Sequence, residues 1–138
     1  MDNAQILRTV IEQGFGCGDL TVADRFAGDT IREHEYLAPQ GGSGAENLRA
    51  MITEARTEMP GMTMSVEDLV VDGDKVWARS VARTAHPTTG AELAITVFDI
   101  CRFQAGKIVE HWGAPDRFSL LHQVGALPPR PNRTATSG

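Results

Sequence analysis

The spacing of apolar residues changes abruptly after Pro60 and Gly61 and then recurs at every second residue almost to the end of the chain. Four alternating segments follow one another, separated by short turns rich in glycine and aspartate; they span residues 62–71, 75–84, 92–103 and 107–112. Strands joined by turns this short pair antiparallel. The pattern therefore predicts an antiparallel sheet in the second half of the molecule.

The first half of the chain has helical spacing instead. A helix is predicted over residues 3–13, a short one over about residues 20–27 and a longer one after the glycine-rich loop at 41–44. Residues 30–37 alternate as a brief strand. Helices that precede a run of strands are typical of an α+β domain, with the helices gathered on one face of a curved sheet.

Composition limits both the size and the partners of the protein. With 138 residues, 41% of them hydrophobic, the chain is expected to form a single domain over residues 1–127, followed by a disordered tail at 128–138. A formal charge of −5 argues against nucleic acid as a partner. The sequence shows neither a signal peptide nor an apolar run long enough to span a bilayer. We therefore expect a cytoplasmic protein with reduced cysteines and no membrane partner.

The two longest motifs are VEDLVVDGDKVWARSVART at 66–84 and FDICRFQAGKIVEHWGAPDRFSLLHQVG at 98–125. Through them, the stretch from residue 34 to 125 resembles the SnoaL-like polyketide cyclase family, a branch of the nuclear transport factor 2-like superfamily. This resemblance implies a cone of helices wrapped by a strongly bent sheet, an apolar cavity inside it, and a homodimer packed through the sheets. Compared with the family, the loop at 85–89 is short.

The acid after the strand that carries Trp112 has two interpretations. Spacing alone favours a helix N-cap for Asp116, because aspartate is a preferred cap and residues 117–125 form a short amphipathic segment. The resemblance implies a general acid/base that faces the cavity, and Asp116 is our main catalytic candidate. Trp112 would then provide a wall for a flat substrate, although plain core packing is equally compatible with its position.

Further candidates lie on two predicted strands. His34, which the resemblance directs into the pocket, is the second catalytic candidate, and Tyr36 on the same strand face is a substrate-binding candidate. In residues 93–103, alternation places Asp99 on one face and Phe98 and Arg102 on the other, and all three are candidates for substrate binding. Of the two interpretations of Asp99, a substrate-binding group or a structural ion pair with Arg79 or Arg102, the residues themselves favour the ion pair.

The four histidines show no metal-binding spacing, and no glycine motif reads as a nucleotide site, so we expect neither metal nor cofactor. His111 and His122 are expected at edge or surface positions. The predicted function is a cofactor-independent polyketide cyclase of secondary metabolism, such as antibiotic biosynthesis, acting on a hydrophobic polycyclic or polyketide-like substrate. Epoxide opening, isomerisation, cycloaddition and a non-catalytic, ligand-binding dimer module are the alternatives.

Overall fold

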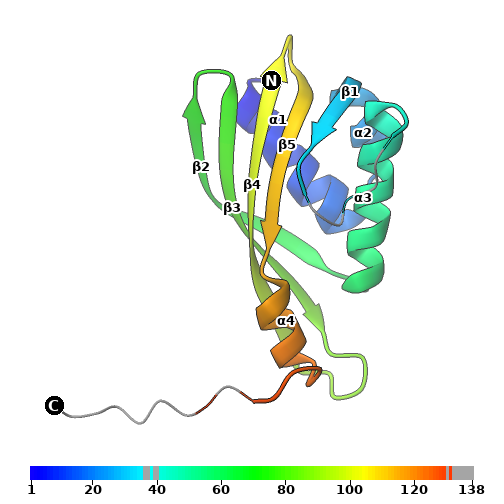
Figure 1. The fold of residues 1–138 in the computed structure, drawn as a ribbon, viewed down its shortest axis with the longest axis vertical. Coiled ribbons are helices and arrows are strands. Elements are labelled where there is room, and N and C mark those ends of the chain that lie inside the picture. The colour runs from blue at the N-terminus through cyan, green and yellow to red at the C-terminus, as the bar shows by residue number, and fades with distance from the viewer. Residues whose placement is uncertain (36–37, 39–40, 130, 132–138) are drawn as a thin grey trace, which may run out of the picture.

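The sheet of this protein contains five strands in the order β1-β5-β4-β3-β2. In the computed structural model, which describes residues 1–35, 38, 41–129 and 131, the helices other than α4 lie along one face of the sheet (Figure 1). The strands are β1 (Ala27–Glu33), β2 (Thr63–Asp72), β3 (Lys75–Ala85), β4 (Glu92–Gln104) and β5 (Lys107–Pro115). Strands β2 to β5 pair antiparallel, as predicted, and the predicted α+β class is confirmed.

Two of the helices begin with matching caps. Helix α1 (Asn3–Thr9) starts at Asp2 and α3 (Gly44–Glu58) starts at Ser43, and in both a side chain three residues further on completes a capping box. Each cap satisfies backbone N–H groups that the first helical turn leaves without partners. Serine and aspartate at these positions therefore define where the helices begin.

The first helical segment extends beyond residue 13, where it was predicted to end. Residues Val10–Phe15 continue α1 as a π-helical segment, η1, which precedes the short α2 (Thr21–Phe26). The wider turn brings Gly14 so close to α2 that a Cβ there would lie 2.8 Å from Val22 Cγ2. Glycine is thus required where the two helices meet.

Alternation along β4 gives the sheet two different faces. The residues that point toward the helices include Ile95, Val97, Asp99 and Cys101, while Phe98, Ile100 and Arg102 point away from them. The helix-facing side packs against the helices in a core that contains Leu7, Ile52 and Val76, all nearly inaccessible to solvent. Burying a side chain of this size contributes roughly 1.5–3 kcal/mol.

The structure corrects two strand boundaries. Strand β1 begins at Ala27, three residues before its predicted start, and pairs parallel with β5 through Arg32–Glu110 and Glu33–His111. Strand β5 does not break at Gly113, because the pairing with β4 continues to Pro115. The final helix α4 (Arg117–Gln123) follows directly. Tyr36 and most of the predicted tail, residues 130 and 132–138, lie outside the described residues.

Candidate active site

A cavity of about 130 Å³ lies between the helices and the inner face of the sheet. Its walls are largely apolar and come from α1, η1, α3 and β4, with side chains such as Leu7, Phe15, Met51, Met59 and Ile95. Such a cavity has the lining expected of a small-molecule site, in which a few polar groups orient an apolar ligand. The polar groups at its wall are therefore the candidates for chemistry.

His111 on β5 is a largely buried polar group at the cavity and is hydrogen-bonded on both sides. Its Nε2 lies 2.7 Å from Asp99 Oδ1, and its Nδ1 lies 2.8 Å from both carboxylate oxygens of Glu33. Strand pairing creates this arrangement, because β5 runs between β4, which carries Asp99, and β1, which carries Glu33. All three side chains line the cavity.

The two carboxylates keep the imidazole charged. Burial by itself lowers the pKa of His111, but the hydrogen bonds and negative charges of Asp99 and Glu33 outweigh that effect and raise the pKa from 6.5 to about 10. At neutral pH, both ring nitrogens therefore carry a proton and donate, one to each carboxylate. Asp99 thus has one oxygen fixed by an imidazolium ion.

A second ionic group lies at the same cavity and joins three elements. Arg117, the first residue of α4, donates from Nη2 to Glu35 Oε1 over 2.9 Å, and its Nε lies 3.6 Å from Glu58 Oε2 at the end of α3. Glu35 follows the end of β1 by two residues. Arg117 therefore connects α4 to α3 and to the segment that follows β1, at the cavity wall.

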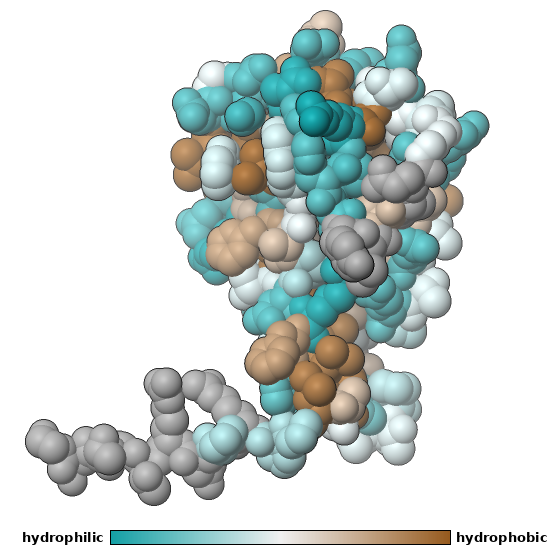
Figure 2. Space-filling model, viewed as in Figure 1, coloured by the Kyte–Doolittle hydropathy of each residue, from teal (hydrophilic) through white to brown (hydrophobic). Residues whose placement is uncertain are grey.

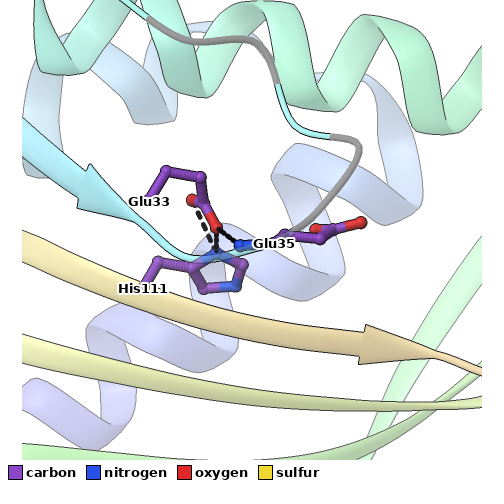
Figure 3. A group of neighbouring side chains, drawn as sticks. All are labelled: Glu33, Glu35 and His111. Carbon is purple, nitrogen blue, oxygen red and sulfur yellow. Dashed lines mark hydrogen bonds and ion pairs between the residues drawn. The ribbon is translucent and has the colours of Figure 1, made fainter.

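Glu33, Glu35 and His111 also have the ligand types of a metal site. One potential ligand atom from each lies within 4.8 Å of the others, and Figure 3 shows Glu33 reaching over the His111 ring from the neighbouring strand. These side chains also take part in hydrogen bonds, since Nδ1 of His111 bonds to Glu33 and Oε1 of Glu35 accepts from Arg117. The prediction of no metal site is not tested by this geometry and stays a prediction.

Gly113 leaves space beside these groups. A Cβ at this position would lie 2.8 Å from His111 Cε1, 3.1 Å from Glu35 Oε2 and 3.2 Å from Asp99 Oδ1. Contacts this close require the neighbouring side chains to shift. The absence of a side chain at residue 113 is therefore part of how the polar cluster fits together.

Several predicted site residues lie on the other face of the sheet. His34 stacks on Trp112 with ring centroids 4.7 Å apart and bonds through Nε2 to Glu110, which also accepts from Arg102. These hydrogen bonds, from Arg102 first and then from His34, hold the pKa of Glu110 below its ordinary value. Phe98 is on the same outer face and is 54% exposed. None of these five side chains is among the described residues that line the cavity.

Asp116 occupies the cap position that its spacing predicts. Its carboxylate accepts a hydrogen bond from the backbone N–H of Ser119 over 3.0 Å and thereby caps α4. It is exposed, and it is not among the described cavity-lining residues. The catalytic roles of Asp116 and His34 stay predictions, as do the substrate-binding roles of Trp112, Phe98 and Arg102.

Among the predicted site residues that the structure describes, which leave out Tyr36, Asp99 alone lies at the cavity. Its ionic partner is His111, whereas Arg79 pairs with Asp68 and Arg102 pairs with Glu110. The prediction of an edge or surface role for His111 is wrong, because His111 is 9% exposed. Sequence reasoning also missed Glu33, Glu35 and Arg117. For the two glutamates, a signal was present in the alternation along residues 30–37, which places Glu33 and Glu35 on the face opposite His34. That signal does not extend to Arg117.

Cys101 lines the cavity beside this cluster but is unsuited to nucleophilic attack. Burial, followed by the negative charges of Asp99 and Glu33, raises the pKa of the Cys101 thiol well above its ordinary value. The thiol therefore stays protonated, and a protonated thiol is a poor nucleophile. Among the described cavity residues, the acids, His111 and Arg117 therefore remain the candidates for chemistry.

Comparison with known protein families identifies the family of this chain. The model of the SnoaL-like polyketide cyclase family matches residues 5–124, which is most of the chain. The protein belongs to the SnoaL-like polyketide cyclase family. A search of curated proteins found no significant match.

Solved structures similar to this chain come from several bacteria. IdmH from Streptomyces antibioticus, described as a proposed polyketide cyclase, has 26% sequence identity and a TM-score of 0.77, covering 91% of this chain and 99% of its own. TsrD from Streptomyces laurentii has 25% identity and a TM-score of 0.75, with 92% and 99% coverage. A proposed polyketide cyclase from Acidithiobacillus ferrooxidans has 18% identity and a TM-score of 0.80, with 92% and 97% coverage, and shows the fold alone.

Proposed function

We propose that this protein is a cofactor-independent polyketide cyclase that closes a carbon–carbon bond within one substrate by acid/base catalysis. The observation that carries the proposal is a carboxylate, Asp99, held by a charged His111 at the wall of an apolar cavity. Membership of the SnoaL-like family and the proposed cyclase function of IdmH support the reaction class. The proposed setting is secondary metabolism, including antibiotic biosynthesis, in the cytoplasm.

The proposed reaction requires one base and an enclosed space. Asp99 removes an acidic proton next to a carbonyl group, and the electrons of the broken C–H bond form an enolate. The enolate carbon attacks a second carbonyl carbon of the same substrate, forming the C–C bond and leaving an alkoxide. Asp99 then returns its proton to that alkoxide. A positioned acid/base of this kind typically accelerates a reaction by about 10²–10⁴-fold.

His111 serves in this scheme as the group that orients Asp99. Its Nε2–H fixes one oxygen of the Asp99 carboxylate, so that the other oxygen is directed consistently. Glu33 holds the opposite side of the ring and prevents it from rotating. Holding the substrate in a reactive fold against apolar walls contributes the remaining acceleration. Asp116 is the alternative base, retained from the sequence, and the experiment must separate the two acids.

The test compares the two acids directly. Proton exchange at the carbon next to the carbonyl of 2-tetralone, a flat enolisable ketone, is followed in D₂O by NMR. We expect Asp99→Asn to lower the enzyme-dependent exchange rate by about 10²–10⁴-fold, because the amide is not a base. Asp116→Asn should retain exchange within a few-fold, because asparagine caps helices as well as aspartate does.

Two outcomes would reject Asp99 as the base. If Asp116→Asn loses exchange while Asp99→Asn keeps it, Asp116 is the acid/base. If wild type shows no exchange with 2-tetralone and no turnover of a panel of polyketide carbonyl compounds, the cyclase proposal itself fails. Glu54→Gln is the matched control, since Glu54 lines the same cavity but is assigned no role in the reaction.

We further propose that the protein forms a homodimer through the outer face of the sheet. Trp77 and Phe98 are 50% and 54% exposed there, and Val70 and Ile100 surround them. Figure 2 shows hydrophobic side chains among the polar ones over the sheet and at α4. Exposed apolar surface of this kind is typical of association surfaces.

A further inference from the structure

We propose that Arg117 binds an oxygen of the substrate through its Nε–H and stabilises the negative charge that this oxygen acquires during the reaction. This inference rests on the proposed function, because it assigns the electrophilic group that a cyclase needs opposite its base. The ligand that the site would take is a carbonyl compound able to form an enolate, or a phenolate that resembles one. Arg117 would then be a catalytic residue in contact with the substrate.

The bonding of Arg117 is incomplete in a specific way. One end of its guanidinium group is occupied, since Nη2 donates to Glu35 Oε1 over 2.9 Å. Its Nε is buried from solvent and, among the described residues, has no hydrogen-bond partner. The carboxylate of Glu58 is close, but its Oε2 lies 3.6 Å from Nε, which is beyond hydrogen-bonding distance.

A buried N–H group of a cation without an acceptor is unusual in folded proteins. Most buried polar atoms have a partner, and an exception calls for an explanation such as a role in binding or catalysis. Here the explanation follows from position, because Arg117 lines the cavity that also contains Asp99. An oxygen of a bound ligand would complete the hydrogen bonding of Nε.

The contacts of Arg117 also fix its orientation before a ligand arrives. Glu35 is 15% exposed and holds Nη2, so the plane of the guanidinium group is set by a partly buried ion pair. Donors that are oriented in advance stabilise developing charge without reorganising during the reaction. No proton leaves Arg117 in this role: its Nε–H donates to the enolate or alkoxide oxygen while Asp99 carries out the proton transfers.

The chemistry of the pair explains why an arginine suits this place. Guanidinium stays charged under all ordinary conditions and presents several N–H groups in a fixed plane, so one can hold Glu35 while another contacts a ligand. A lysine at residue 117 would keep the charge but lose this geometry. Comparing Arg117→Lys with Arg117→Gln therefore separates the effect of the positive charge from the effect of the direction of the N–H groups.

Binding of a chromogenic probe tests the assignment without turnover. 4-Nitrophenol absorbs differently as phenol and phenolate, and titration into the protein at several pH values gives the affinity for each form. We expect the ratio of phenolate affinity to phenol affinity to be about 10- to 100-fold higher in wild type than in Arg117→Gln. A difference of this size corresponds to one charge-assisted hydrogen bond. The test uses the difference in phenolate preference between wild type and Arg117→Gln, because the neighbouring carboxylates affect the preference of both proteins.

Matched variants at the end of α3 extend the test. Glu58→Gln removes a carboxylate that lies 3.6 Å from Nε and should raise phenolate affinity, whereas Glu54→Gln removes the same charge from the same helix and should change it less. 4-Nitroanisole, which cannot ionise, should bind wild type and Arg117→Gln equally. Arg117→Lys should retain folding, checked by thermal unfolding, but only part of the phenolate preference.

The results separate this inference from the cyclase proposal. An equal phenolate preference in wild type and Arg117→Gln overturns the role of Arg117, as does a wild type that binds neither form of the probe. Proton exchange that depends on Asp99 can persist in either of those cases. Conversely, phenolate binding through Arg117 can persist when Asp99→Asn has no effect on exchange, and then the proposed function alone fails.

Discussion

His111 combines deep burial with a positive charge, and this combination has a thermodynamic consequence. Its pKa is about 10 in the folded protein and 6.5 without the folded environment. Because the folded state holds the proton more tightly, the stabilisation is fully present below pH 6.5 and is lost as the pH rises through 10. Each unit of pKa difference corresponds to about 1.4 kcal/mol.

We therefore predict that the free energy of unfolding of wild type falls by a few kcal/mol between about pH 6.5 and pH 10. Urea unfolding followed by circular dichroism at a series of pH values measures it. His111→Gln should show a flatter curve over the same interval, since glutamine does not titrate. Parallel curves for the two proteins would mean that His111 is not charged in the folded state.

Gly113 offers a second test at the residue scale. A methyl group added there would meet His111, Glu35 and Asp99 at 2.8–3.2 Å. We predict that Gly113→Ala destabilises the protein by about 1–3 kcal/mol, the usual cost of overpacking, and slows proton exchange by displacing Asp99. Ala114→Ser is the control, because Ala114 is exposed on the outer face. Unchanged stability and exchange in Gly113→Ala would show that the cluster has room to adjust.

At the scale of elements, α3 supplies one wall of the cavity and depends on its first turn. The Ser43 side chain accepts from the Glu46 backbone N–H, and Glu46 bonds back to the backbone of Ser43. Leu48, Met51 and Ala55 of this helix, together with Met59 directly after it, line the cavity. The cap thus supports a wall of the candidate active site from some distance.

We predict that Ser43→Ala lowers the free energy of unfolding by about 1 kcal/mol, because the first turn loses an acceptor for its backbone N–H. Chemical denaturation measures the change. Thr53→Ala is a suitable comparison on the same helix, since the Thr53 hydroxyl bonds within the helix to the Arg49 carbonyl and alanine is the better helix former there. Equal stability of Ser43→Ala and wild type would contradict a stabilising role of the cap.

The spacing of apolar residues predicted where the helices and strands are better than it predicted which strands lie side by side. The helices and the antiparallel strands follow from the spacing of apolar residues and from caps such as Asp116, which are local properties of the sequence. The meeting of His111 with Glu33 depends instead on the parallel pairing of β1 with β5, which joins distant segments. No local pattern specifies that pairing.

Local spacing also leaves open which face of a strand points toward the helices, as β4 and the segment around the end of β1 show. Alternation correctly separated Asp99 from Phe98 and Arg102, and along residues 30–37 it also puts Glu33 and Glu35 opposite His34. It does not indicate which group faces the helices. A histidine is a more usual cavity residue than two glutamates, whereas here the glutamates lie inside because His111 and Arg117 neutralise them.

For the whole molecule, the described residues contain no helix with the length and apolar content needed to cross a bilayer. The exposed aromatic side chains of the sheet instead motivate the proposed dimer. We predict that Phe98→Asp converts a wild-type dimer to a monomer, because it places charge at the centre of an apolar contact. Size-exclusion chromatography with light scattering measures the mass.

Phe118→Asp is the control for this experiment, because Phe118 is 69% exposed but belongs to α4 and not to the sheet. It should keep the mass of wild type. A monomeric wild type, or a dimer that survives Phe98→Asp, would contradict association through this face. Proton exchange in the monomeric variant would then show whether the cavity functions within a single chain.

The two faces of β4 finally limit how this chain can change over generations. Neighbouring residues of the strand lie on opposite faces of the sheet: Asp99 lines the cavity, whereas Phe98 and Ile100 lie on the outer face. A single-residue deletion in the middle of β4 would shift half of the strand by one residue. Every side chain in that half would then move to the opposite face of the sheet. Substitutions, by contrast, alter one side at a time. Lineages of this chain should therefore diversify by exchanging side chains on β4 and by varying loop length, and should keep the length of the strand constant.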